Sequence, residues 1–227
     1  MRLIAHSLLI CAIAGFVSVA NAQECKNGKC PTTLTATKTV QDGECKDGQC
    51  PIETAMGHLP KMEYKIGEKT TCCPKSAAAM AKESGSEMTF VVAKKEFQNK
   101  EKAYTHLVET TEKFVKTFGT PCKCEVSKTT TIAGKSCSCP IETAKRTKLV
   151  STAMDNVKMS YKVGEKTCDC PLKAASLAKA SGDNKEFVVG KECTTCEMTA
   201  RLNLARAKYK AAVTALAKAE PKKEVKK

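Results

Sequence analysis

Two segments of this chain repeat each other without a gap, and their cysteines fall at matching positions. The segment MEYKIGEKTTCCPKSAAAMAKESG, residues 62–85, returns 97 residues later as MSYKVGEKTCDCPLKAASLAKASG, residues 159–182. The similarity continues beyond both segments, through FVVAK and FVVGK. A shorter block, CPIETA, begins at Cys50 and again at Cys139, an offset of 89 residues. Because a shared pattern of apolar and polar residues favours a shared packing, we expect the two halves to fold alike.

The first 22 residues have the layout of a secretory signal peptide. Arg2 supplies a positive start, an apolar run follows, and Ala20-Asn21-Ala22 matches a small-x-small cleavage site. We therefore expect export to the periplasm or the extracellular space, with a mature chain that begins at Gln23. No later segment approaches the ~20 apolar residues that a membrane helix needs, so we expect no membrane span.

The cysteines are numerous and the large apolar side chains are few. Of the 15 cysteines, Cys11 lies in the signal segment, which leaves 14 in the mature chain. Tryptophan is absent and aromatic residues make up 4% of the sequence. A repeated core of roughly 60 residues is marginal on its apolar packing alone. We therefore expect the cysteines to stabilise the chain, either as disulfides or through a bound metal.

The residue pattern predicts an α+β fold of two tandem small repeats, each in the order hairpin, helix, hairpin, helix, and each stapled by cysteines. Alternating apolar and polar residues around Gly67 and Gly164 indicate hairpins. Each hairpin is followed by a helix with proline at its expected start and glycine at its expected end: Pro74 with Gly85, and Pro171 with Gly182.

A longer helix is expected to close each repeat. Apolar residues recur every three or four positions from Tyr104 to Phe118 and from Met198 to Leu216. We therefore divide the chain into a signal peptide (1–22), a first repeat (23–119, core 62–118), a second repeat (120–219, core 159–217) and a charged tail (220–227).

The cysteines of each half form three pairs in the same order. They are Cys25 with Cys30, Cys45 with Cys50 and Cys72 with Cys73 in the first half, and Cys122 with Cys124, Cys137 with Cys139 and Cys168 with Cys170 in the second, while Cys193 and Cys196 are additional. Since the duplication keeps the pairs while changing their internal spacing, we expect the pair before PIETA to meet the pair at the later helix start. The candidate ligands are Cys45, Cys50, Cys72, Cys73, Cys137, Cys139, Cys168 and Cys170.

Three chemistries are open for these thiols. Closely spaced thiolates are ligands for soft metal ions, with Zn²⁺ and Cu(I) as the candidates. An even number of cysteines in an exported chain equally suits disulfides; adjacent cysteines would bond elsewhere, because a vicinal bridge is strained. Thiol–disulfide exchange is the third, since Cys193 and Cys196 have the C-x-x-C spacing of a redox pair.

A family resemblance favours the metal interpretation. The run CPIETA…PKMEYKIGEKTTCCPKSAAAMAKES resembles the YHS/TRASH-type cysteine metal-binding motif of exported bacterial heavy-metal proteins, over about 35 residues of each half. The resemblance implies two sets of ligands: Cys50 with Cys72 or Cys73, and Cys139 with Cys168 or Cys170.

Other function classes are poorly supported by the sequence. The formal net charge of +14 is dominated by lysine and favours anionic polymers or a cell surface. With so few aromatic residues and an export signal, the chain does not look like a nucleic-acid-binding protein. There is no nucleophile elbow, phosphate loop or HExxH helix. We expect a non-enzymatic binding protein whose leading ligands are soft metal ions; the alternatives are a disulfide-stapled structural or interaction protein and a thiol–disulfide oxidoreductase.

Overall fold

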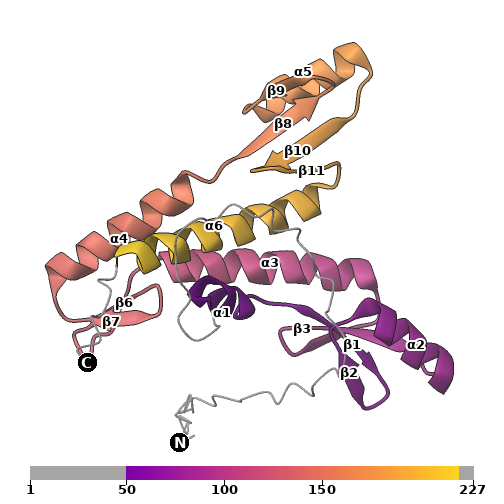
Figure 1. Ribbon diagram of the computed structural model, residues 1–227, viewed down its shortest axis with the longest axis horizontal. Helices are drawn as coiled ribbons and strands as arrows, with labels where there is room; N and C mark the ends of the chain where they lie inside the picture. The colour runs from indigo at the N-terminus through magenta and orange to yellow at the C-terminus, as the bar shows by residue number, and fades with distance from the viewer. Residues whose placement is uncertain (1–49, 220–227) are drawn as a thin grey trace, which may run out of the picture. The chain divides into compact units, whose positions relative to one another are not determined.

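The computed structural model describes residues 50–219, which form a mixed α/β structure of helices and antiparallel sheets (Figure 1). The predicted signal peptide, three cysteines of the first half and the charged tail lie outside the described residues; these cysteines are Cys25, Cys30 and Cys45. None of the helices within residues 50–219 is long and apolar enough to cross a membrane.

The first sheet has four antiparallel strands in the order β2-β1-β3-β4. The strands are β1 (Met62–Ile66), β2 (Lys69–Thr71), β3 (Met88–Val92) and β4 (Lys95–Phe97). Helix α2 (Pro74–Ser84) joins the two hairpins, and α3 (Lys100–Gly119) follows the second. As predicted, α2 begins at its proline and ends at Gly85, which takes the left-handed conformation with φ of 64°.

The second sheet has the order β11-β10-β8-β9. Its elements are β8 (Met159–Val163), β9 (Lys166–Cys168), α5 (Pro171–Ser181), β10 (Lys185–Val189), β11 (Glu192–Thr194) and α6 (Glu197–Ala219). Its register follows that of the first sheet at the offset of 97 residues. Tyr64 pairs with Thr71 in the first sheet, and Tyr161 pairs with Cys168 in the second.

A third, smaller sheet and two helices lie outside the two predicted cores. The sheet has the order β5-β6-β7, and its strands are β5 (Cys122–Lys123), β6 (Thr130–Ile132) and β7 (Lys135–Cys137). Helices α1 (Pro51–Gly57) and α4 (Pro140–Asp155) begin at the two CPIETA blocks. The full length of α4 was not predicted, because Val150 is its one buried residue and its apolar periodicity is correspondingly weak.

Helix α6 contributes to every apolar cluster of the described chain. It supplies Leu202 to the cluster of the first sheet, Ala200 to that of the second, Ala205 and Tyr209 to a third with Val115, and Ala212 and Leu216 to a fourth with Val150. The Tyr209 ring meets Phe118 edge-on, with centroids 4.8 Å apart. Helix α6 therefore packs against elements from both halves of the sequence. Its first two turns contact the clusters of both four-stranded sheets.

Candidate thiol sites at the strand-to-helix junctions

Five of the six described helices begin at a cysteine. Cys50, Cys73, Cys139 and Cys170 are the N-cap residues of α1, α2, α4 and α5, Cys196 directly precedes α6, and Asn99 caps α3. In all six, the carbonyl oxygen of this residue accepts a hydrogen bond of 2.9–3.1 Å from the N–H four residues ahead. The cysteines thus occupy one structural position, the residue at which an extended chain turns into a helix.

Asn99 caps α3 with its side chain. Its Oδ1 accepts from the N–H groups of Glu101 and Lys102, at 2.7 and 3.1 Å. The four cysteine N-caps Cys50, Cys73, Cys139 and Cys170 make no side-chain capping bond. Each is followed by proline, which has no N–H and a φ already suited to a helix. The sulfur atoms at these positions are therefore not required to start the helices.

The residue two positions before the N-cap ends the preceding strand, and its side chain folds back onto the junction. At α2 the N–H of Cys73 donates to Oγ1 of Thr71 at 3.2 Å. At α4 the N–H of Cys139 donates to Sγ of Cys137 at 3.3 Å. A cysteine thiol has therefore taken the place of a threonine hydroxyl in the same local structure.

Two junctions carry cysteine at both positions, which gives the pairs Cys137/Cys139 and Cys168/Cys170. In both pairs the first Sγ lies 3.7 Å from the carbonyl oxygen of the second cysteine. The first member of each pair is half-buried beneath the helix start, the second is exposed, and all four are free thiols in the structure. Each junction therefore presents two thiols at the positive end of a helix, where negative charge is favoured.

The surroundings of the two pairs differ in charge and share an apolar neighbour. Glu142 Oε2 lies 3.6 Å from Cys137 Sγ, whereas Lys173 holds the corresponding position of α5. Ile141 and Leu172 directly follow the two prolines and are 68% and 78% exposed. Each pair therefore has one exposed apolar side chain close to it in the chain.

The four sulfurs expected to converge in the second half do not form one cluster. No group of three or more His, Cys, Asp or Glu residues that could hold a metal ion occurs within residues 50–219. The physical reason is α4, whose 16 residues span about 24 Å. Cys139 precedes this helix, whereas Cys168 pairs with Tyr161 just beyond its other end. In the first half, Cys45 lies outside the described residues, and the expected meeting of Cys45/Cys50 with Cys72/Cys73 stays a prediction.

The remaining pair of the second half, Cys122 and Cys124, lies on β5 and the turn that follows it. Cys122 pairs with Thr131 and Cys137 pairs with Thr130, so the two cysteines face opposite sides of the small sheet. The side-chain hydroxyl of Ser127, followed by its N–H, lowers the pKa of Cys124 by hydrogen bonding to the sulfur. Cys122/Cys124 is therefore separate from the junction pair on β7 and α4.

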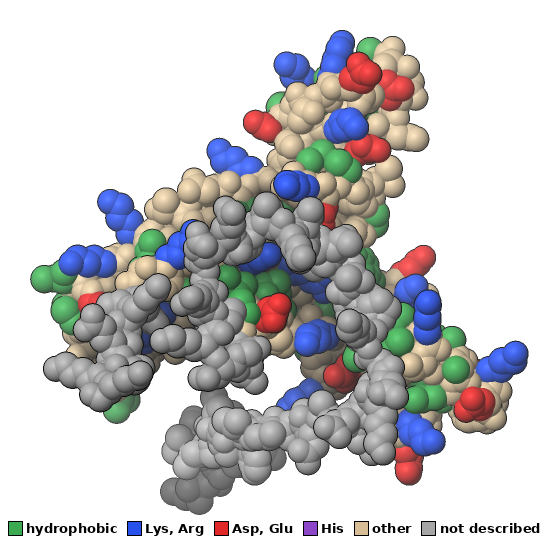
Figure 2. All heavy atoms as spheres, in the orientation of Figure 1, with side chains coloured by type: hydrophobic (Ala, Val, Ile, Leu, Met, Phe, Trp, Pro, Cys, Tyr) green, Lys and Arg blue, Asp and Glu red, His purple; other side chains and the backbone are tan. Residues whose placement is uncertain are grey.

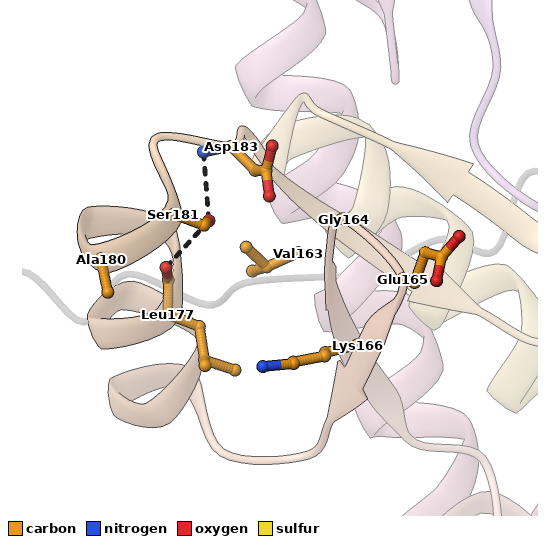
Figure 3. Close-up of a pocket in the computed structure, with 8 residues that line it drawn as sticks. All are labelled: Val163, Gly164, Glu165, Lys166, Leu177, Ala180, Ser181 and Asp183. Atoms are coloured by element: carbon orange, nitrogen blue, oxygen red, sulfur yellow. Dashed lines mark hydrogen bonds between the residues drawn. The ribbon is translucent and has the colours of Figure 1, made fainter.

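A hollow of about 480 Å³ lies between the β8–β9 turn and α5, away from the thiols (Figure 3). Its lining includes Val163, Leu177 and Asp183 but no cysteine, and Figure 3 shows Lys166 reaching from β9 toward α5. Gly164 has a φ of 58°, and a Cβ there would lie 2.9 Å from Oδ2 of Asp183. The glycine therefore serves the turn, and the hollow brings no group to the thiol chemistry.

On one face of the molecule the basic side chains do not gather into a single patch. On the face that Figure 2 shows, Lys and Arg side chains are scattered over the elements and interspersed with Asp and Glu. No protein-family model, curated protein or solved structure matches the chain.

Proposed function

We propose that this chain is an exported protein that binds soft metal ions through paired thiols. The observation that carries the proposal is the repeated C-x-C junction at Cys137/Cys139 and Cys168/Cys170. At each, one thiol ends a strand and the other begins a helix, with the first Sγ 3.7 Å from the carbonyl oxygen of the second residue. Thiolate is the ligand type that soft ions such as Cu(I) prefer.

The number of thiols at a junction bears on which ion is bound. Structural Zn²⁺ sites are almost always four-coordinate. A single junction offers two sulfurs, and no larger group of ligands occurs within residues 50–219. This favours Cu(I) over Zn²⁺ at an isolated junction, and it predicts that Zn²⁺ binds only when ligands from elsewhere join.

The helix start supports the protonation state that metal binding needs. A thiol must lose its proton to become a ligand, so binding releases protons. The partial positive charge at a helix N-terminus stabilises the thiolate that results. The exposed second thiol of each pair, Cys139 or Cys170, gives an ion direct access from solvent.

The proposal includes two tandem repeats, 23–119 and 120–219, with cores at 62–118 and 159–217. The equivalent registers of the two four-stranded sheets support this division. The cysteines would staple these small cores through metal or through disulfides. The first repeat contributes Cys45, Cys50, Cys72 and Cys73 to the same chemistry, and the resemblance to YHS/TRASH-type motifs is consistent with it.

The proposed setting is the periplasm or the exterior of the cell, after removal of residues 1–22. Removal of Arg2 with this segment lowers the formal net charge from +14 to +13, and this lysine-rich charge would favour loose association with anionic cell-surface polymers. In an oxidising compartment, bound metal and disulfide formation compete for the same thiols. The disulfide-stapled protein without metal is therefore the alternative that an experiment must separate.

The test is elemental analysis of the mature chain after anaerobic loading with Cu(I), using paired serine variants. C137S/C139S and C168S/C170S should each lose about one equivalent of copper, because each removes one pair of soft ligands. C193S/C196S is the matched control, since it also removes two thiols beside a helix start, and it should retain the wild-type copper content. Equal copper loss in all three variants, or no copper bound by the reduced wild type, would contradict the proposal.

A further inference from the structure

Cys193 and Cys196 are not part of the proposed metal sites. The local structure of this pair differs from that of the C-x-C pairs at those sites. Cys193, on β11, pairs with Val188 of β10. The next residue, Thr194, pairs with Phe187 of β10 and faces the helices. Because neighbouring strand residues face opposite sides, Cys193 lies on the outer face of the sheet. The chain bends at Thr195 and Cys196 begins α6, so both thiols are exposed on either side of one bend.

The sulfur of Cys196 is surrounded by hydrogen-bond donors. The hydroxyl of Thr199 and then its N–H are the largest causes of the lowered pKa of Cys196. Burial opposes them, the N–H of Met198 lowers the pKa further by a smaller amount, and the Glu197 charge has the smallest opposing effect. At the other cysteine-capped helices the residue three positions ahead is Glu53, Ser76, Glu142 or Lys173. The hydroxyl and N–H of Thr199 therefore favour the thiolate form of Cys196.

A second side chain orients the Thr199 hydroxyl from a different part of the fold. The phenolic O–H of Tyr104, on α3, donates to Oγ1 of Thr199 at 3.1 Å. That bond occupies a lone pair of the Thr199 oxygen and leaves its own hydrogen for the sulfur. Met198 and Leu202 pack into the cluster of the first sheet and Ala200 into that of the second, so the start of α6 is rigidly held.

We propose that Cys193 and Cys196 form a redox-active dithiol, in which Cys196 is the nucleophile, Cys193 is the resolving thiol, and the substrate is a disulfide. The Cys196 thiolate attacks one sulfur of R–S–S–R′, forming a mixed disulfide and releasing R′–S⁻, which takes up a proton. Cys193, as thiolate, then attacks Cys196 Sγ and releases R–S⁻. The pair loses two electrons and two protons and the substrate becomes two thiols; the reverse sequence oxidises a dithiol.

This inference goes beyond metal binding and rests on other residues, so either can fail alone. The probe is oxidised glutathione, added anaerobically to the reduced, metal-free mature chain and followed by peptide mass spectrometry. The wild type should give a Cys193–Cys196 disulfide and reduced glutathione. C193S should stop at glutathione bound to Cys196, and C196S should form neither product at this bend. Glutathione retained on Cys193 in C196S, or no crosslink in the wild type, would overturn the proposal.

The role of Thr199 gives an independent readout. T199V should slow alkylation of Cys196 at neutral pH by about threefold to tenfold, because a donor to the thiolate is lost. T199S keeps a hydroxyl and should restore the rate, whereas Y104F should cause a smaller decrease. Cys170, at the same position of α5 but with Lys173 three residues ahead, is the internal reference and should react more slowly than Cys196. Equal rates for the two thiols in the wild type would contradict the assignment.

Discussion

The N–H of Cys139 donates a hydrogen bond to the Sγ atom of Cys137, at 3.3 Å. The equivalent bond ends on a hydroxyl at two other junctions, where Cys73 donates to Thr71 and Cys196 donates to Thr194, both at 3.2 Å. A threonine hydroxyl can therefore accept the hydrogen bond that forms the junction. A cysteine in this place adds a soft ligand without being needed for the turn.

This equivalence gives a substitution that separates structure from metal binding. C137T should leave the free energy of unfolding of the metal-free chain within about 0.5 kcal/mol of wild type, because the side-chain acceptor is retained. It should also remove the copper bound at that junction. Chemical denaturation and elemental analysis of the same preparation measure both effects. Full copper retention in C137T would show that Cys137 is not a ligand.

The helix N-caps provide a second contrast. N99A should destabilise the chain by about 1 kcal/mol, because the N–H groups of Glu101 and Lys102 lose their acceptor. C139A and C170A should cost only a few tenths, because neither side chain makes a capping bond. Denaturant midpoints of the three metal-free variants test the contrast. A cost for C139A equal to that of N99A would mean that the sulfur is needed to start α4.

Sequence patterns were sufficient for the elements with strong local signals. The turn at Gly67, the proline-started α2 and the long α3 were predicted, since alternation, proline position and helical periodicity all point to local structure. Helix α4 lacks such a signal, because much of its surface stays exposed. Its length is also the reason why four cysteines that look equivalent in sequence do not meet: spacing along a chain does not show how far a rigid helix separates its ends.

The sequence predicted cysteines at the starts of α2 and α5, which the structure confirms with Cys73 and Cys170 as N-cap residues. It was not recognised from sequence that Cys50, Cys139 and Cys196 hold the same position, although the residues that reveal it are visible there. Within residues 50–219 each C-P step and the C-T-T-C motif precede a helix, and Asn99 occupies the equivalent place of Cys196. The donors around Cys196 were not predictable, because Tyr104 is 95 residues from Thr199 and only tertiary packing brings them together.

The packing of α4 against α6 can be tested with two valines of opposite exposure. Val150 is 0% exposed and lies in a cluster with Ala212 and Leu216. V150A should destabilise the chain by about 2 kcal/mol, because it leaves a cavity between these helices. V126A is the control, since Val126 is 93% exposed and should change stability by less than about 0.5 kcal/mol. Similar effects of the two substitutions would contradict the described position of α4.

The Cys124 thiol should show a pH dependence that Ser127 controls. The hydroxyl and N–H of Ser127 lower the pKa of Cys124 from its ordinary value of 9.0. A folded-state pKa below the unfolded value stabilises the folded chain at pH above the unfolded value, and this contribution is lost as pH falls through the folded pKa. S127A should therefore move the pH profile of Cys124 alkylation upward. An unchanged profile would mean that the Ser127 hydroxyl does not contact the thiolate.

The most direct measurement for the central claim is site-resolved alkylation of the reduced protein, before and after anaerobic loading with Cu(I). The account predicts that copper protects Cys137, Cys139, Cys168 and Cys170, and that all four alkylate once a chelator removes the metal. Intact peptides crosslinked through these cysteines in the protein isolated from the exported fraction, together with no protection by Cu(I) after reduction, would contradict it and favour the disulfide-stapled protein.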